Sequence, residues 1–196
     1  MQFQVTSGVL HVSDPSYNKT YGDPEQKIFL PLALRLKPAA QGTWTAHIKM
    51  DEQYPTREQE LMVFHQASGP PTEWTASSKL GVDAGMMSIF EEDAYPDSPF
   101  DDTEFYEAMC NLSQGGGIWK DQGVVCHSGF GDGFYQVLIS RNDAETIVGV
   151  KVIFITQEER DMWLRLTSQT PSEQDGETTS DEELASDKQT PLTEEK

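Results

Sequence analysis

The sequence predicts a mainly β (α+β) domain, an antiparallel β-sandwich or barrel-like sheet with one or two short helices, followed by a disordered acidic C-terminal tail. Three observations predict this fold class: short segments that alternate apolar and polar residues, clusters of Gly, Pro, Asn and Asp between them, and two late segments with helical spacing. The chain of 196 residues suits one domain with an extension and is long enough to bury a core.

The clearest predicted strand lies within residues 43–50, TWTAHIKM. Trp44, Ala46 and Ile48 would face one side of a sheet, and Thr45 and His47 would face the other. Segments of similar character predict further strands at 8–14, 60–66, 123–128, 134–140 and 145–155.

Two segments predict helices. In the first, residues 101–112, carboxylates stand where a helix begins, and Phe105, Met109 and Leu112 recur along one face. In the second, residues 156–166, Thr156 and Glu159 have the spacing of a capping box. The apolar stripe of that second helix would consist of Met162, Trp163 and Leu166.

Composition changes after Leu166, which predicts one β-rich globular domain over 1–166 and a disordered acidic tail over 167–196. The tail holds nine acidic residues, two lysines and no aromatic residue, so it cannot bury enough apolar surface to offset its ordering entropy. It therefore carries −7 of the formal net charge of −19, and −12 remains in the domain.

This charge bears on the partners of the protein. Nucleic-acid backbones and anionic membrane surfaces are met by clustered Lys and Arg, and the 14 such residues here are spread along the chain. We therefore expect neither direct nucleic-acid binding nor membrane binding. A basic protein partner fits the charge, and so does solubility without any partner. The sequence does not indicate an oligomeric state.

Cysteine usage and the N-terminus favour a cytoplasmic protein. Cys110 and Cys126 are the only cysteines, and two thiols outside any paired motif more often stay reduced, although one disulfide between them stays open. The first ten residues lack a basic region followed by an apolar stretch, which is the pattern of a secretory signal.

Three aspartates stand in turn-like surroundings: Asp14 precedes Pro15, Asp83 lies in LGVDAG, and Asp132 lies in SGFGDGF. Asp132-Gly133 between two apolar runs predicts a tight hairpin in which Asp132 fixes its own turn. The glycines that would form these turns are Gly81, Gly85, Gly129, Gly131 and Gly133.

Familiar catalytic motifs are missing around these glycines. The last glycine of G-x-G-x-x-G is replaced by Phe134, and a strand rather than a helix should follow, which argues against a phosphate-binding loop. No G-x-S-x-G motif surrounds Ser88 or Ser128, and the four histidines lack zinc spacing. Cys126 and His127 are neighbours on a predicted strand, so they should face opposite sides.

Residues 91–107 hold eight carboxylates in seventeen residues, with aromatic residues among them. The register of an EF-hand is missing, so a solvated acidic loop is expected. Aromatic anchors among carboxylates would also suit a basic partner surface. The binding residues predicted on this basis are Asp93, Tyr95, Asp97, Phe100, Asp101, Asp102 and Tyr106.

Together, Asp14-Pro15, the V-D-A-G at 82–85 and the S-G-x-G-D-G-x-Y at 128–135 resemble the uncharacterised bacterial family called domain of unknown function 4241. The resemblance covers about residues 7 to 155, and the chain departs from the family in its acidic insert after Phe90 and in its tail. It implies a related fold and no particular activity.

Two functions follow as hypotheses. The first is a non-catalytic acidic binding protein, an inhibitor or an immunity-type protein that engages a basic partner surface. The second is a carboxylate-based hydrolase that uses Asp14, Asp83 and Asp132, with His127 as a base. No cofactor is predicted for the first, whereas the second could use calcium or magnesium to activate water.

Overall fold

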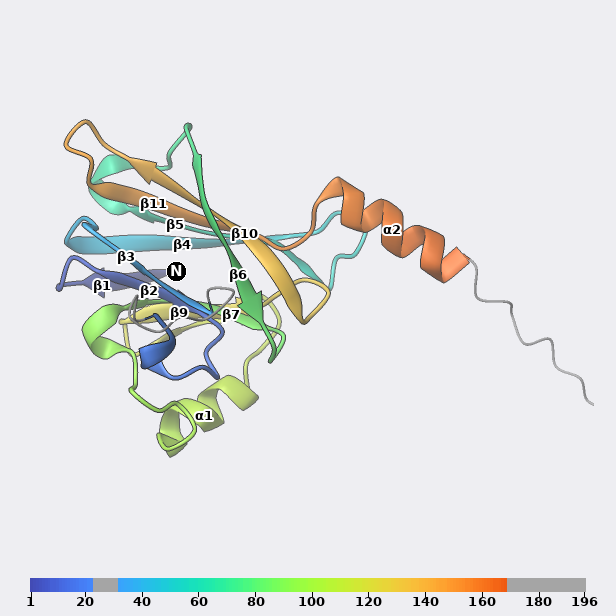
Figure 1. Ribbon diagram of the computed structural model, residues 1–196, viewed down its shortest axis with the longest axis horizontal. Coiled ribbons are helices and arrows are strands. Elements are labelled where there is room, and N and C mark those ends of the chain that lie inside the picture. The colour runs from blue at the N-terminus through green and yellow to red at the C-terminus, as the bar shows by residue number, and fades with distance from the viewer. Residues whose placement is uncertain (23–31, 169–196) are drawn as a thin grey trace, which may run out of the picture.

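The structure is a computed structural model that describes residues 1–22 and 32–168, and it consists of two antiparallel β-sheets with two α-helices (Figure 1). The fold-class prediction is confirmed. The predicted tail falls almost wholly outside the described residues. The second helix continues to Ser168, two residues beyond the predicted domain boundary.

The first sheet has six strands, which follow one another across the sheet in this order: β1 (Gln2–Val5), β4 (Gly42–Met50), β5 (Glu58–His65), β11 (Ile147–Ile153), β10 (Gly133–Arg141) and β6 (Thr75–Val82). The second sheet has five strands in the order β3 (Ala33–Leu36), β2 (Leu10–Ser13), β7 (Met86–Glu91), β9 (Gly123–His127) and β8 (Gly117–Trp119). Short 3-10 turns add η1 (Lys19–Gly22), η2 (Gln66–Ser68) and η3 (Glu92–Ala94).

The main core fills the space between the sheets, and the alternation within the strands explains it. In β4, Trp44 and Ala46 are buried whereas His47 and Lys49 are exposed, as the period-two pattern predicted. The six predicted strand segments all contain strands, whereas β1, β3, β6, β7 and β8 were not predicted. Of these strands, β1, β3 and β8 are short, and β6 and β7 flank the V-D-A-G turn.

Helix α1 (Thr103–Cys110) covers the outer face of the five-stranded sheet (Figure 1). The Asp102 carboxylate accepts a hydrogen bond of 3.0 Å from the backbone nitrogen of Phe105, which satisfies a free N–H group of the first turn. Phe105 and Met109 are buried in a second apolar cluster with Phe90 of β7 and Tyr95, which follows η3. The predicted helix is confirmed over Thr103–Cys110 with Phe105 and Met109 buried, whereas Leu112 lies beyond its end and is partly buried against the same cluster.

Helix α2 (Gln157–Ser168) projects away from the sheets (Figure 1). Its predicted capping box is present, because Glu159 accepts from the Thr156 backbone nitrogen at 2.7 Å and the Thr156 hydroxyl accepts from Glu159 at 3.2 Å. The predicted apolar stripe does not join the core: Met162 is 56% exposed, and Trp163, 39% exposed, stacks on Phe130 with ring centroids 4.9 Å apart.

Residues 83–85 and 128–132 carry the chain between the two sheets. β6 pairs with β10 in the first sheet, and their continuations β7 and β9 pair with each other in the second. The ladder changes sheets between the pairs Gly133–Val82 and Met86–His127. Two adjacent strands therefore bend together at a corner, which is how strands pass from one packed sheet to another. We call residues 83–85 and 128–132 the corner.

The predicted hairpin at Asp132-Gly133 is wrong, because β9 and β10 lie in different sheets. A two-residue hairpin joins strands that pair with each other, and these two strands pair with other neighbours. Gly81 and Gly133 were expected in turns but lie inside β6 and β10. Gly85, Gly129 and Gly131 do occupy the corner, with φ of +64°, +60° and +108°.

Candidate functional site

The Asp14 carboxylate joins the N-terminal D-P turn to the V-D-A-G turn. Its Oδ1 accepts hydrogen bonds from the backbone nitrogen and the hydroxyl of Ser16, both at 2.8 Å. Its Oδ2 accepts from the backbone nitrogens of Asp83 at 2.8 Å and Ala84 at 2.6 Å. Asp14 is fully buried, so four donors take the place of water around its charge.

The 128–132 loop is closed by Ser128 and Tyr135, not by Asp132. The Ser128 hydroxyl donates to the Gly131 carbonyl at 2.7 Å, and the Tyr135 hydroxyl contacts the carbonyls of both Ser128 and Gly131. The Ser128 backbone nitrogen donates to the Gly85 carbonyl at 2.9 Å and so ties this loop to the V-D-A-G turn. Among the described residues, no hydrogen bond to the Asp132 carboxylate is found, and the proposed self-closing turn is wrong.

Gly129 is required by packing as well as by its positive φ. A Cβ atom at this position would lie 2.9 Å from side-chain atoms of Ile155 and Phe154, and 3.1 Å from the carbonyl oxygen of Glu58. The two contacts at 2.9 Å are closer than real Cβ atoms show, so glycine lets the loop approach the core. The opening glycines of the S-G-x-G-D-G motif thus serve the corner of the fold.

The three predicted catalytic aspartates do not form one carboxylate site. Asp14 is buried and engaged, whereas Asp83 and Asp132 are exposed. All three lie near Tyr17: burial first, then the charges of Asp14, Asp83 and Asp132, raise the pKa of that phenol to about 12. Within residues 1–22 and 32–168, no group of three or more His, Cys, Asp or Glu side chains is arranged to hold a metal ion.

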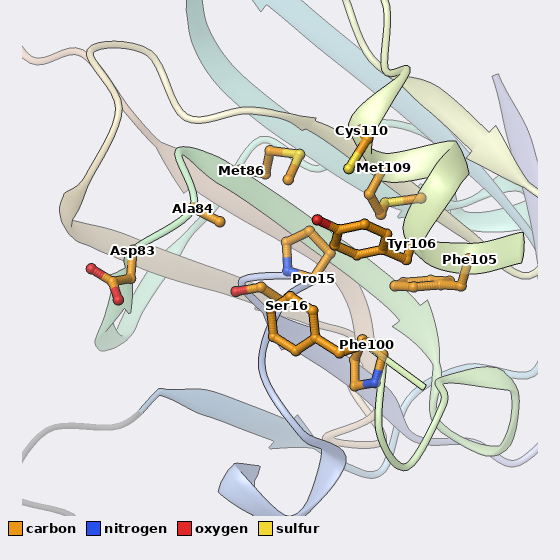
Figure 2. A pocket seen from close by; sticks show the side chains of 11 residues that line it. Pro15, Ser16, Asp83, Ala84, Met86, Phe100, Phe105, Tyr106, Met109 and Cys110 are labelled. Atoms are coloured by element: carbon orange, nitrogen blue, oxygen red, sulfur yellow. The ribbon is translucent and has the colours of Figure 1, made fainter. Parts of the chain in front are cut away.

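A cavity of about 340 Å³ lies between α1 and the corner, and we call it the α1 pocket (Figure 2). Its apolar wall includes Met86, Phe100, Tyr106 and Met109, while Asp83 stands at one edge with its carboxylate directed away from the other side chains (Figure 2). A pocket of this volume that is mostly apolar is typical of sites that accept a ligand or a partner side chain.

The outer aromatic residues of the α1 pocket are unusually accessible. Phe100 is 62% exposed and Tyr106 is 45% exposed, and their rings lie 5.6 Å apart at the centroids. A hydrogen bond with the Cys110 thiol raises the pKa of Tyr106, because the bond favours the protonated phenol. These two rings are predicted binding residues that the structure brings together.

Tyr95, another predicted binding residue, belongs to the core. It is 2% exposed, stacks on His11 with centroids 4.1 Å apart, and donates from its hydroxyl to the Tyr17 carbonyl at 2.8 Å. Burial raises the pKa of this phenol above its usual range. Tyr95 is therefore unavailable to a partner, and its prediction as an interface residue is wrong.

The acidic run 91–107 is only partly solvated, since its first two carboxylates are buried. Glu91 accepts from the backbone nitrogens of Thr6 and Ser7. Glu92 is 3% exposed and forms an ion pair with Arg35, whose Nη2 lies 2.7 Å from its Oε1, while His11 Nδ1 lies 3.1 Å from its other oxygen. The remaining predicted carboxylates are exposed, namely Asp93, Asp97, Asp101 and the capping Asp102.

A second cavity, of about 420 Å³, lies on the other side of Ala84, and we call it the His127 cavity. Its walls include Arg57, Glu58 and His127 together with Gly85, Gly129 and Gly131 of the corner. The His127 Nδ1 atom lies 3.5 Å from Oε1 of Glu58, whose side chain is 2% exposed. Nothing in the sequence singles out Glu58 or Arg57, because only the fold brings the β4–β5 turn to the corner.

The two cysteines are both free: Cys110 is exposed on α1, and Cys126 is buried in β9. Burial raises the pKa of the Cys126 thiol well above its ordinary value, which keeps the sulfur protonated and unreactive. Cys126 and His127 face opposite sides of their strand, as predicted: Cys126 is buried, and the His127 side chain is 42% exposed.

No family model matches the chain, and no curated protein and no solved structure was found to be similar to it. The resemblance to domain of unknown function 4241 therefore stays a prediction. Across the part of the chain that the structure describes, no helix is long and apolar enough to cross a membrane.

Proposed function

We propose that this protein is a non-catalytic binding protein that engages a basic protein partner through the α1 pocket. One observation carries the proposal: the exposed rings of Phe100 and Tyr106 stand at an apolar cavity within a run of carboxylates. The role we propose is that of an inhibitor or an immunity-type protein that covers a basic surface of its partner.

The aromatic rings would supply the anchor. Hot spots of protein interfaces are enriched in Tyr and Trp, and they sit in well-packed apolar pockets. Phe100 and Tyr106 together with Met86 offer such a surface, and the buried Phe105 and Met109 support it from below. A large apolar side chain of the partner would fill the cavity.

The carboxylates would supply steering and selectivity. Residues 91–107 contain no Lys or Arg, and Asp97, Asp101 and Glu107 are exposed on the same segment. The nearby Glu104 is paired with Lys120 at 2.6 Å, so it contributes less to the negative potential. Complementary rim charges mainly raise the association rate and reject acidic partners.

The hydrolase hypothesis is less well supported, because its central carboxylate is occupied. Asp14 accepts from four donors and is fully buried, so it can neither hold water nor exchange protons with a substrate. Of the three aspartates, this leaves Asp83 and Asp132, which are exposed at the surface of the corner.

A displayed random-peptide library tests the proposal. Selection on the full chain should enrich peptides with one large apolar residue between basic residues, and their affinity should fall as salt rises. Tyr106→Ala and Phe100→Ala should each weaken selected peptides by about tenfold or more, as expected for interface hot spots. Phe134→Ala is the matched control, since Phe134 is 53% exposed on β10 and lies outside the pocket wall.

Charge is tested separately. The double variant Asp97→Asn/Asp101→Asn should slow peptide association, while Asp143→Asn/Glu145→Gln removes two carboxylates from the distant β10–β11 turn and should change little. Peptides without an excess of Lys and Arg, or peptides that bind both ring variants as tightly as the wild type, would contradict the proposal.

A further inference from the structure

We infer that the His127 cavity is a second binding site, separate from the α1 pocket, which takes a small ligand through an anionic carboxylate or phosphate group. The inference does not depend on the proposed function. It rests on the cavity, on two basic side chains in its wall, and on the bare backbone of the corner.

The cavity has the size and composition of a small-ligand site. Its volume of about 420 Å³ falls within the usual range of roughly 300–1,000 Å³ for such sites. Segments far apart in the sequence form its wall: the turn before β5, the V-D-A-G turn and the S-G-x-G loop. The hydrogen bond from Ser128 to Gly85 fixes the last two relative to each other.

Glu58 orients the His127 ring. The Glu58 carboxylate is almost fully covered, and its Oε1 accepts from the backbone nitrogen of Gly115 at 3.0 Å. The same oxygen lies 3.5 Å from Nδ1 of His127, so the opposite ring nitrogen, Nε2, is directed away from the carboxylate. With 42% of the His127 side chain exposed, the imidazolium form of the ring donates from Nε2 to an anionic ligand while its Nδ1 faces Glu58.

Arg57 supplies the permanent positive charge. It is exposed, and its Nη1 donates to the Gly129 carbonyl at 3.3 Å. This bond uses one of the five N–H donors of a guanidinium, and the others suit the oxygens of a carboxylate or a phosphate. The Glu58 carboxylate shares this wall, but it is covered and accepts from the Gly115 backbone nitrogen, whereas Arg57 is exposed.

The three corner glycines add backbone to the wall, beside Thr56, Ala84 and Gln114. A Cβ atom on Gly131 would have no neighbour within 4 Å, so the loop presents its main chain to open space there. Asp132 stands at the rim, with Oδ1 4.0 Å from where a Cβ atom on Gly85 would lie. Its charge would repel an anion, which makes Asp132 a useful probe.

The test is an NMR titration of the full chain with inorganic phosphate and, separately, with acetate at constant ionic strength. We expect saturable shifts of the Gly85, Gly129 and Gly131 amides. Arg57→Gln and His127→Gln should each weaken binding by about tenfold, because each removes a charge-assisted or ring N–H donor. Asp132→Asn should strengthen binding by about twofold to fivefold, because a repulsive charge a few ångströms away is removed.

Matched controls are Arg141→Gln and His47→Gln, which lie on exposed positions of other strands and should leave binding unchanged. Saturation by phosphate alone would assign a phosphoryl ligand, and saturation by acetate alone a carboxylate ligand. Shifts that do not saturate with either anion, or that are the same in Arg57→Gln and in the wild type, would overturn the inference.

Discussion

The Oδ2 atom of Asp14 lies 2.6 Å from the backbone nitrogen of Ala84, across 70 residues of sequence. This carboxylate holds the V-D-A-G turn, and the Gly85 carbonyl of that turn holds the S-G-x-G loop through Ser128. Three short motifs thus form one hydrogen-bonded corner. The aspartate farthest from the others in sequence stabilises the place where two strands change sheets.

Asp14→Asn should destabilise the protein strongly. An amide keeps one acceptor oxygen and turns an NH₂ group towards N–H donors, so at least one buried donor loses its partner. We expect the free energy of unfolding to fall by about 2 to 3 kcal/mol, the usual cost of such a loss at a charged acceptor. Denaturant unfolding followed by tryptophan fluorescence measures this change.

Asp83→Asn and Asp132→Asn are the controls for that experiment. Both side chains are exposed, so each substitution should change the free energy of unfolding by no more than about 0.5 kcal/mol. Equal destabilisation by all three substitutions would mean that the aspartates act as one unit, contrary to the hydrogen bonds seen here.

The sequence predicted the fold class because alternation and capping are local properties. Trp44 and Ala46 in β4, Asp102 before α1, and Thr156 with Glu159 before α2 all act within a few residues. The hairpin at Asp132 failed for a physical reason. Its turn residues are correct for a tight bend, but β10 pairs with β6, which is distant in sequence, and with β11, which follows it, and not with β9.

The candidate sites show the same difference between local properties, which the sequence predicts, and contacts between distant segments, which it does not. Phe100 and Tyr106 were predicted because aromatic residues among carboxylates are conspicuous, and they do line a cavity. Tyr95 and Glu92 have the same local composition, yet they are buried. Their partners His11 and Arg35 lie on β2 and β3, which are distant from residues 91–107 in sequence. Burial of a charged residue depends on such partners, which composition does not reveal.

The pair His11–Glu92 should make stability fall in acid. Burial is the largest effect on His11 and lowers its pKa below 6.5, although Glu92 opposes it. Burial alone would raise the pKa of Glu92, but the hydrogen bond and charge of His11, and the charge of Arg35, hold it below 4.5. Both groups take up protons more readily when unfolded, so stability is lost as pH falls below about 6.5.

The measurement is the free energy of unfolding from pH 7 to pH 4. His11→Gln keeps a side-chain donor for Glu92 and removes the titration, so its stability should decline less steeply between pH 6.5 and pH 5. His47→Gln is the control, since His47 is exposed on β4. Identical slopes in wild type and His11→Gln would exclude His11 as the source.

Tyr135→Phe tests the closure of the S-G-x-G loop. The hydroxyl contacts two carbonyls, those of Ser128 and Gly131, so its removal should lower the free energy of unfolding by about 1 to 2 kcal/mol. Burial raises the Tyr135 pKa from 10 to about 12, so the folded state holds its proton more tightly. Its contribution is complete below pH 10 and is lost as pH rises towards 12.

Absorbance of the phenolate at alkaline pH checks this prediction. In the folded wild type, Tyr135 should ionise near pH 12, and Tyr135→Phe should remove one group from that late titration. Loss of an early-titrating tyrosine instead, or an unchanged free energy of unfolding at pH 8, would show that the hydroxyl does not close the loop.

Arg160→Gln should release α2 from the domain. Asp51 is buried, accepts from the backbone nitrogens of Gln53 and Tyr54, and is paired with Arg160 Nε at 2.7 Å. Burial alone would raise the Asp51 pKa, but these hydrogen bonds hold it below 3.8. Without Arg160, a buried charge loses its partner, and we expect the free energy of unfolding to fall by about 2 to 3 kcal/mol.

Hydrogen exchange of the α2 amides distinguishes local release from global loss. In Arg160→Gln these amides should exchange faster than those of β5 and β11, whereas Arg160→Lys, which keeps the charge without the planar fork, should be intermediate. Glu158→Gln is the control on the exposed face of the same helix.

The stabilisation by Asp51 is present above pH 3.8 and is lost below it, so the free energies of unfolding of wild type and Arg160→Gln should converge in acid. If they stay apart at low pH, the ion pair is not what holds the helix.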